Sequence, residues 1–415
     1  MNSTSVYPFI FFVVFQLATL FPLKSAEPFP GINEALEKGS QKVKIVCFGD
    51  SVTGLYYHTG GERTYTDMLG IALKQIHPKA SVEMINAGIS GHTTANGLGR
   101  IDPHVLAHKP DLVTVMFGLN DVAKDSIEKY RANLIEIVDR CRAAGSKVIL
   151  CTPNAVITTP ARPVEKLEAY CEVLREVARS KNVVLCDSYN GFVEMRKADP
   201  LKWRLTLSDE IHPNMAGHKV IAEQIAETIT GERTSLQKVG PPDSPLSKTG
   251  ALLVKGGGGR VSIVAMPPFD GLVIPAMKRD QAKVNVSVSQ WPVEGLSLEQ
   301  LRKDASGRIR KMKPNLVLIA IPRSAKAVDQ EKFIYTQYWI ANFSLSFGKK
   351  EWDTVVIHPS VMKPAIPKGE EKNDELIRTL TGAHDMHLID RKPGDDRNGE
   401  EIFNEWMQIH LAKKD

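Results

Sequence analysis

Short apolar segments alternate with longer segments of helical period through the first half of the chain. In the helical segments apolar side chains recur on one face, as Tyr130, Leu134 and Ile137 do. Strands that are apolar almost throughout are buried on both sides. The pattern therefore predicts a parallel sheet with helices on both faces, a three-layer α/β/α sandwich. The expected strands are 43–48, 82–86, 112–117, 147–151 and 183–187.

The N-terminal segment has a different character. Residues 6–23 form an apolar run without a charged side chain, followed by Lys24, Ser25 and Ala26. This order is typical of a signal peptide, so we expect residues 1–26 to direct the protein to a secreted or periplasmic location and to be removed. An uncleaved membrane anchor is the alternative, because Lys24 is unusual beside a cleavage site. No later segment is long and apolar enough to span a bilayer.

Length and composition indicate a soluble protein of two domains. The chain has 415 residues, of which 42% are hydrophobic and 24% charged. Its net charge of +5 is spread among acidic residues, which is not the basic stripe of a nucleic-acid binder. The five cysteines lack metal-ligand spacing and are interpreted as small buried hydrophobic residues. His104 and His108 share a helical face but have no third ligand in view, so we expect no metal and no cofactor.

Glycine and polar residues follow the predicted strands at the points where a parallel sheet binds ligands. A fourth group stands before the last helix of this half, and the loop 55–63 beyond Ser51 combines aromatic side chains with Arg63. This loop is expected to border a pocket for a polar ester or, alternatively, to pack against the second domain. The four groups are Gly49-Asp50-Ser51, Asn86-Ala87-Gly88, Gly118-Leu119-Asn120-Asp121 and Asp209-Glu210-Ile211-His212.

These groups contain the side chains that acyl transfer needs. Ser51, in a tight turn after a strand, is the candidate nucleophile, and His212 is the candidate base. Asp209 precedes His212 by three residues and can orient it, with Glu210 as the fallback. The amides of Ser51 and Gly88 and the side chain of Asn120 are candidate donors to an oxyanion. Three neighbouring residues are expected to have structural rather than catalytic roles. Asp50 would form a turn or cap a helix, Asp121 would fix its loop, and His218 would be a structural residue.

In this order the four groups resemble the signature blocks of the SGNH (GDSL-like) hydrolases over about residues 43–230. The resemblance implies a flavodoxin-like sheet, Ser51 as nucleophile, Asp209 and His212 as the rest of a triad, and an oxyanion hole of Ser51, Gly88 and Asn120. The G-x-S-x-G elbow of other α/β-hydrolases does not occur around Ser51, where the sequence is GDSVTG.

The expected function is therefore that of a secreted serine hydrolase. It would cleave carboxylic esters, small-molecule or glycan esters such as acetylated carbohydrates, through an acyl-enzyme on Ser51. One alternative is a lipase or lysophospholipase with a longer acyl site. The other is a non-catalytic secreted protein that binds glycans or acts as a scaffold.

The second half of the chain shows a faint copy of the first. Lys-Pro-Asp-Leu-Val at 109–113 recurs as Lys-Pro-Asn-Leu-Val at 313–317, and 43–46, 147–150 and 184–187 find matches in order at 261–264, 354–357 and 387–390. Phe269 then stands opposite Ser51, Gln290 lies near the position opposite Gly88, and Ser324 stands opposite Asn120. We expect a degenerate, inactive α/β domain, although chance similarity between two α/β sandwiches is the simpler alternative. The predicted boundaries are 40–232 for the hydrolase domain, 233–258 for a linker and 259–415 for the second domain.

Overall fold

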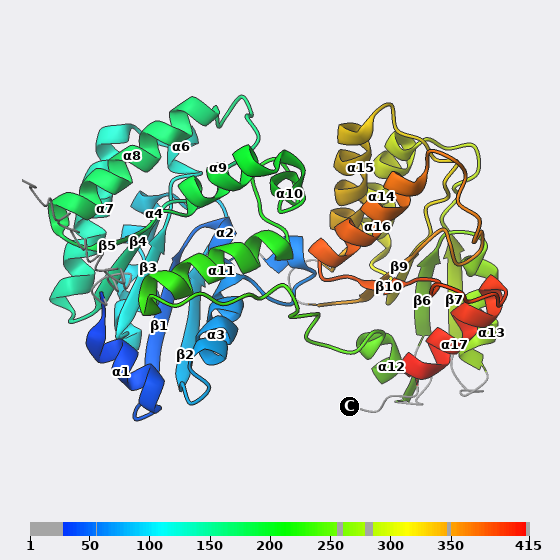
Figure 1. The fold of residues 1–415 in the computed structure, drawn as a ribbon, viewed down its shortest axis with the longest axis horizontal. Coiled ribbons are helices and arrows are strands. Elements are labelled where there is room, and N and C mark those ends of the chain that lie inside the picture. Colours follow the sequence, from blue (N-terminus) through cyan, green and yellow to red (C-terminus); the bar gives the residue numbers. More distant parts are fainter. Residues whose placement is uncertain (1–27, 55, 255–259, 279–284, 347–349, 412–415) are drawn as a thin grey trace, which may run out of the picture.

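The computed structural model describes residues 28–54, 56–254, 260–278, 285–346 and 350–411, and the predicted signal peptide lies outside them. These residues form two α/β units that lie next to each other (Figure 1). The first unit is built on strands β1–β5 and the second on β6–β10. Among the described helices, none combines the length and apolar character that a membrane crossing requires.

The first unit contains a five-stranded parallel sheet in the order β2-β1-β3-β4-β5. Its central strand β3 is buried along its whole length, whereas the side chains of the edge strand β2 are mostly half-buried. The apolar segments of the sequence thus became the strands of one sheet, as expected. The strands are β1 (Val43–Gly49), β2 (Val82–Gly88), β3 (Leu112–Met116), β4 (Lys147–Cys151) and β5 (Val184–Cys186).

Helices cover both faces of this sheet. The chain runs from β1 out to β2 and then back to β3, β4 and β5, and right-handed crossovers in opposite directions place helices on opposite faces. α3 and α11 pack against each other on one side, and α7 and α8 pack together on the other (Figure 1). The helices are α1 (Pro30–Lys38), α2 (Ser51–Gly54), α3 (Tyr65–Ile76), α4 (Thr94–Leu98), α5 (Ile101–His104), α6 (Asp121–Lys124), α7 (Ile127–Ala143), α8 (Val164–Lys181), α9 (Ser188–Ala198), α10 (Pro200–Arg204) and α11 (Met215–Thr230), with 3₁₀ turns η1 (Tyr56–Thr59) and η2 (Leu106–His108). The predicted three-layer sandwich is confirmed.

The second unit repeats this architecture with strand order β10-β9-β8-β6-β7, again all parallel. Part of the predicted linker forms a helix, α12, which packs on β6 and β9. The elements are α12 (Ser247–Val254), β6 (Arg260–Ala265), α13 (Phe269–Lys278), β7 (Asn285–Gln290), α14 (Leu298–Met312), β8 (Leu316–Ile319), α15 (Gln330–Ser344), β9 (Asp353–Ile357), α16 (Glu371–Ala383), β10 (His387–Ile389) and α17 (Gly399–Leu411).

Strand pairing supports the internal similarity seen in the sequence. Ile45 pairs with Leu112 in the first sheet, and Ile263 pairs with Leu316 in the second, in the register that the sequence match predicts. One hydrogen bond from a strand amide to a side chain also occurs in both units. The Lys44 amide donates to the Asp111 carboxylate, and the Ser262 amide donates to the Asn315 side chain. The fourth strand differs by one residue: Leu112 pairs with Lys147 and Leu316 with Asp353, so Lys147 corresponds to Asp353 and not to Thr354.

Each unit has its own hydrophobic core, one extending from Phe29 to Leu236 and the other from Leu246 to Met407. The five cysteines are buried and unpaired in the first core, as the sequence indicated. Contacts between the units involve α10, α11 and η1 on one side and α15 and α16 on the other. The second unit is therefore packed directly against the loops that follow the first sheet.

Candidate active site

Ser51 is the first residue of the short helix α2, immediately after β1. Its side chain is almost buried, with 7% of the residue exposed, and its Oγ lies 2.9 Å from Nε2 of His212. The turn between strand and helix is held by Asp50, whose Oδ1 accepts the Val52 amide at 3.0 Å. Gly49 allows this turn because a Cβ there would lie 2.5 Å from the Met116 carbonyl oxygen. The local sequence thus presents the Ser51 hydroxyl at the carboxyl edge of the sheet.

The loop 208–212 holds Asp209 and His212 in one rigid arrangement. Asp209 Oδ1 accepts the amides of Ile211 and His212 at 2.8 and 2.7 Å, while Oδ2 lies 2.8 Å from His212 Nδ1. The Ser208 amide closes the loop by donating to the His212 carbonyl at 2.9 Å. Asp209, and not the fallback Glu210, contacts the imidazole.

The charge state of Asp209 follows from these contacts. Burial alone would raise the pKa of Asp209, but the charge of His212 and the hydrogen bonds from its ring and amide lower the pKa by more, to well below its ordinary range. Asp209 is therefore ionised at neutral pH. A buried carboxylate in this position holds the imidazole in one orientation, with Nε2 directed toward the Ser51 hydroxyl.

The candidate oxyanion donors differ in whether they are already hydrogen-bonded to other protein groups. The Asn120 side chain is oriented by its neighbours, because its Nδ2 donates to the His92 carbonyl at 3.1 Å and its Oδ1 accepts from Arg162 at 3.0 Å. The Gly88 amide already donates to Asn86 Oδ1 at 3.0 Å. For the amides of Ser51 and Gly91, the described part of the chain records no acceptor. Gly91, which directly precedes the residue that Asn120 contacts, was not singled out from the sequence.

Gly88 has a structural reason to lack a side chain. A Cβ at this position would lie 2.3 Å from the Gly54 amide nitrogen and 2.7 Å from the Thr53 carbonyl carbon. The end of β2 therefore touches the backbone of the helix that carries Ser51. The close approach, rather than an open amide, explains this glycine.

Two other polar residues, Asp121 and His218, have the structural roles expected from the sequence. Asp121 accepts the amide and hydroxyl of Thr94 at 2.9 and 2.6 Å and so fixes the start of α4. His218 is buried and accepts the Tyr65 amide at 3.1 Å, and burial lowers the pKa of His218 to about 3. Neither residue contacts Ser51 or His212 through a hydrogen bond that the structure records.

His58 is a site residue that the sequence did not identify individually. Its ring stacks on that of His212, with centroids 4.3 Å apart, and its Nε2 lies 3.4 Å from Asp209 Oδ2. The loop 55–63 was expected to border the site or to pack on the second domain, and it does both, since Arg63 forms an ion pair with Asp385 of the second unit. The aromatic and polar composition of the loop indicated that it lies near the site, but nothing in the sequence distinguished His58 from the other residues of the loop.

His58, Asp209 and His212 place their ligand atoms within 4.8 Å of one another, so they could hold a metal ion by distance. Both nitrogens of His212 are engaged, however, Nδ1 with Asp209 and Nε2 with Ser51. A metal would have to displace one of these partners. The group fits a proton-transferring triad better than a metal site.

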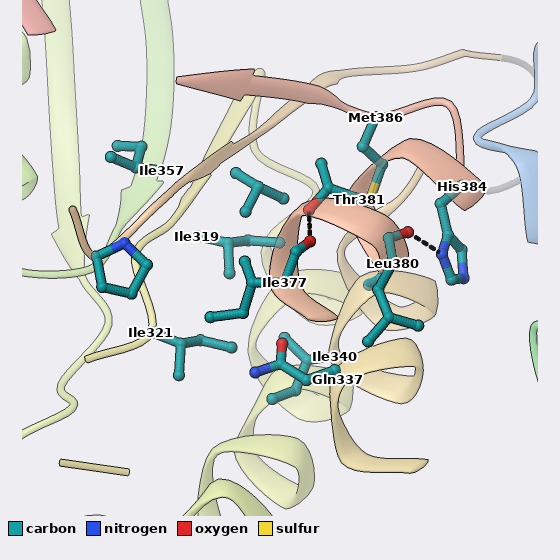
Figure 2. A pocket seen from close by; sticks show the side chains of 13 residues that line it. Ile319, Ile321, Gln337, Ile340, Ile357, Ile377, Leu380, Thr381, His384 and Met386 are labelled. Carbon is teal, nitrogen blue, oxygen red and sulfur yellow. Dashed lines mark hydrogen bonds between the residues drawn. The ribbon is translucent and has the colours of Figure 1, made fainter. Parts of the chain in front are cut away.

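The second unit has a pocket of a different kind, lined mainly by apolar side chains between α15 and α16 (Figure 2). Of its polar residues, Thr381 and His384 bond back to carbonyl oxygens within α16, at 2.6 and 2.8 Å. At the position opposite Ser51, Phe269 is buried at the start of α13. At the position that corresponds to Ser51, the second unit therefore carries an apolar side chain and no hydroxyl.

A buried serine and aspartate and a partly buried histidine at the carboxyl edge of a parallel sheet define the first unit as an α/β/α fold with the side chains of a serine hydrolase. Residues 47–220 match the model of the GDSL-like Lipase/Acylhydrolase family. This match confirms, for the first unit, the resemblance noted in the sequence.

Several characterised proteins are similar to the same part of the chain. An acetylxylan esterase from Geobacillus stearothermophilus is 27% identical over 172 residues, which is 38% of this chain and 76% of the relative. An arylesterase from Vibrio mimicus is 26% identical over 187 residues, 45% of this chain and 88% of the relative. A solved structure of an acetylxylan esterase from Geobacillus stearothermophilus aligns with 46% of this chain and 95% of its own, at 26% identity and a TM-score of 0.41.

Proposed function

We propose that this protein is an exported serine esterase that removes acyl groups from carbohydrate esters, with Ser51 as nucleophile. The observation that carries the proposal is the continuous chain of contacts from Ser51 Oγ to His212 Nε2 at 2.9 Å and from His212 Nδ1 to Asp209 Oδ2 at 2.8 Å. These are the distances at which a base can take a hydroxyl proton and be held by a carboxylate. Export is inferred from the N-terminal apolar run alone.

The reaction would proceed in two halves. Ser51 Oγ attacks the ester carbonyl carbon while its proton passes to His212 Nε2, and the bond to the alcohol breaks as His212 returns that proton to the leaving oxygen. Water then attacks the acyl-Ser51 ester, giving its proton to His212, and the acid leaves as the proton returns to Ser51. Asp209 remains ionised throughout and stabilises the imidazolium that forms in each half.

The negative charge on the carbonyl oxygen needs donors that are available before the reaction. The Ser51 amide and the second hydrogen of Asn120 Nδ2 satisfy this requirement. Because the Gly88 amide is engaged by Asn86, we assign the third donor to the Gly91 amide instead. Preorganised donors of this kind stabilise a transition state because they need no reorientation during the reaction.

Carbohydrate acetates are proposed as substrates because an acetylxylan esterase is similar to the first unit over most of its own length. The polar loop 55–63, which reaches the site through His58, supports a polar ester over a long acyl chain. Fold alone does not select a substrate, so this choice depends on the loops and on the similarity.

The test is hydrolysis by the purified protein of 4-nitrophenyl acetate and of acetylated xylooligosaccharides, compared with the Ser51→Ala variant. We expect turnover of both by the wild type, at most trace turnover by the variant, and labelling by a fluorophosphonate that depends on Ser51. Equal turnover by wild type and variant would contradict the proposal, and so would a wild type that is neither active nor labelled. A series of aryl esters from acetate to laurate separates a short acyl site from that of a lipase.

A further inference from the structure

The second unit reaches the catalytic loop through one buried side chain, Asn342 of α15. Its Oδ1 accepts the Ser208 hydroxyl at 2.7 Å, and its Nδ2 donates to the Ser208 carbonyl oxygen. Asn342 and Ser208 are fully buried, and Ser208 is the residue directly before Asp209. A residue 134 positions away therefore holds both the backbone and the side chain at the start of the loop that carries the triad.

The same hydroxyl connects Asn342 with His58. Ser208 Oγ lies 2.5 Å from His58 Nδ1. A hydroxyl has one proton, and Ser208 donates it to Asn342, so the ring nitrogen must donate to Ser208 Oγ. Asn342 thereby sets which nitrogen of His58 carries the proton and how the ring is turned.

His58 in turn packs directly against two residues of the triad. Its ring stacks on His212 with an interplanar angle of 23°, and its Nε2 lies beside Asp209 Oδ2. Burial, together with the charge of His212, lowers the pKa of His58 well below its ordinary value. The ring is therefore neutral at working pH and adds no positive charge that would compete with His212 for Asp209.

We propose that Asn342 and His58 are positioning residues of the active site, and that the second unit completes this site by holding the Asp209–His212 loop and the ring packed on His212. This inference rests on the proposed esterase function. It assigns the second unit a part in the reaction although Phe269 stands at its position corresponding to Ser51.

Other contacts between the units allow positioning to be separated from simple packing. Lys219 pairs with Asp385 at 2.7 Å, and both side chains are nearly buried. This pair joins α11 to the loop after α16, and Asp385 also pairs with Arg63 at 3.2 Å. Neither ion pair touches Ser208, His58 or the triad in any contact that the structure records. Asp385→Asn is therefore a matched control that weakens the same interface.

The experiment compares Asn342→Leu, which keeps the side-chain size and removes both hydrogen bonds, with Asp385→Asn in the full chain. We expect kcat for 4-nitrophenyl acetate to fall about 10- to 100-fold in Asn342→Leu with KM nearly unchanged, because misplaced catalytic groups cost turnover more than binding. In Asp385→Asn, kcat should change less than about twofold. A loss of kcat in Asn342→Leu no larger than in the control would overturn the proposal.

Two further measurements cover a variant that folds poorly or a wild type that is inactive. His58→Phe keeps the stacked ring but cannot donate to Ser208, and it should show the same loss of kcat with unchanged KM. The Nδ1 proton of His212 should give a far-downfield nuclear magnetic resonance signal in the wild type, assigned by its absence in His212→Asn. This signal should shift or broaden in Asn342→Leu but not in Asp385→Asn; an unchanged signal would refute positioning whatever the activity, whereas a shifted signal in an inactive protein would refute only the proposed esterase function.

Discussion

Replacing Asp50 by asparagine should remove much of the pH dependence of the stability of the first unit. The Asp50 carboxyl is 1% exposed and has one backbone donor, the Val52 amide. Burial raises the pKa of Asp50 from the ordinary 3.8 to about 7, and the hydrogen bond from Val52 and the charges of His212 and Arg162 offset only part of this effect. Asparagine has nearly the same shape and does not titrate.

The sign follows from proton binding. Between pH 4 and pH 7 the folded protein holds a proton on Asp50 that the unfolded chain has released, so the free energy of unfolding falls as pH rises. The Asp50 contribution is complete below the unfolded pKa and is lost as pH passes the folded one. A rise from 3.8 to about 7 corresponds to about 4 kcal/mol in total, of which roughly 2.5 kcal/mol falls between pH 5 and pH 8.

The assay can isolate the first unit because all five cysteines lie in its core. Wild type and Asp50→Asn would be equilibrated in urea at pH 5 and at pH 8, and a short thiol-labelling pulse at one common pH would report the unfolded fraction. We expect the unfolding free energy of the wild type, relative to the variant, to be roughly 2.5 kcal/mol larger at pH 5 than at pH 8. A relative stability that is flat across this range, or that rises with pH, would refute the reasoning.

Three further substitutions test the catalytic geometry. Asp209→Asn should keep the fold but lower kcat about 10⁴-fold, because a neutral amide no longer stabilises the imidazolium; steady-state kinetics check this, and a loss below tenfold would remove Asp209 from the triad. Asn120→Ala should lower kcat about 10²–10³-fold with little change in KM, since it deletes one oxyanion donor, and a pure KM effect would indicate ground-state binding instead. Gly88→Ala should destabilise the first unit by about 1–3 kcal/mol in the thiol assay, because its Cβ would lie 2.3 Å from the Gly54 nitrogen, and unchanged stability would show that this close approach is relieved at no cost.

Much of the first unit could be predicted because its determinants are local. Apolar runs became the five strands, the spacing of Tyr130, Leu134 and Ile137 became the buried face of α7, and Asp209 with His212 lie three residues apart in one loop. Such patterns depend on side-chain period and turn chemistry within a few residues, which the sequence displays directly.

What the sequence could not determine involves contacts across long separations. Gly88 was predicted to be an oxyanion donor, but its amide donates to Asn86, whereas the described residues include no recorded acceptor for the Gly91 amide. The sequence alignment of β4 with β9 was wrong by one residue. An apolar run does not show which of its residues pairs with the neighbouring strand, whereas the hydrogen-bonded pairing in the structure does.

The site itself shows both sides of this division. The sequence alone predicted Ser51, Asp209 and His212 as site residues and placed them at strand ends and loops. Only the tertiary structure could show that Ser51 meets His212 across 161 residues, and that Asn342 of the second unit meets Ser208 across 134. The physical reason is that the local pattern of apolar and polar residues determines which segments form the strands and helices of each layer. Which buried polar groups become partners is decided only when the two units pack against each other.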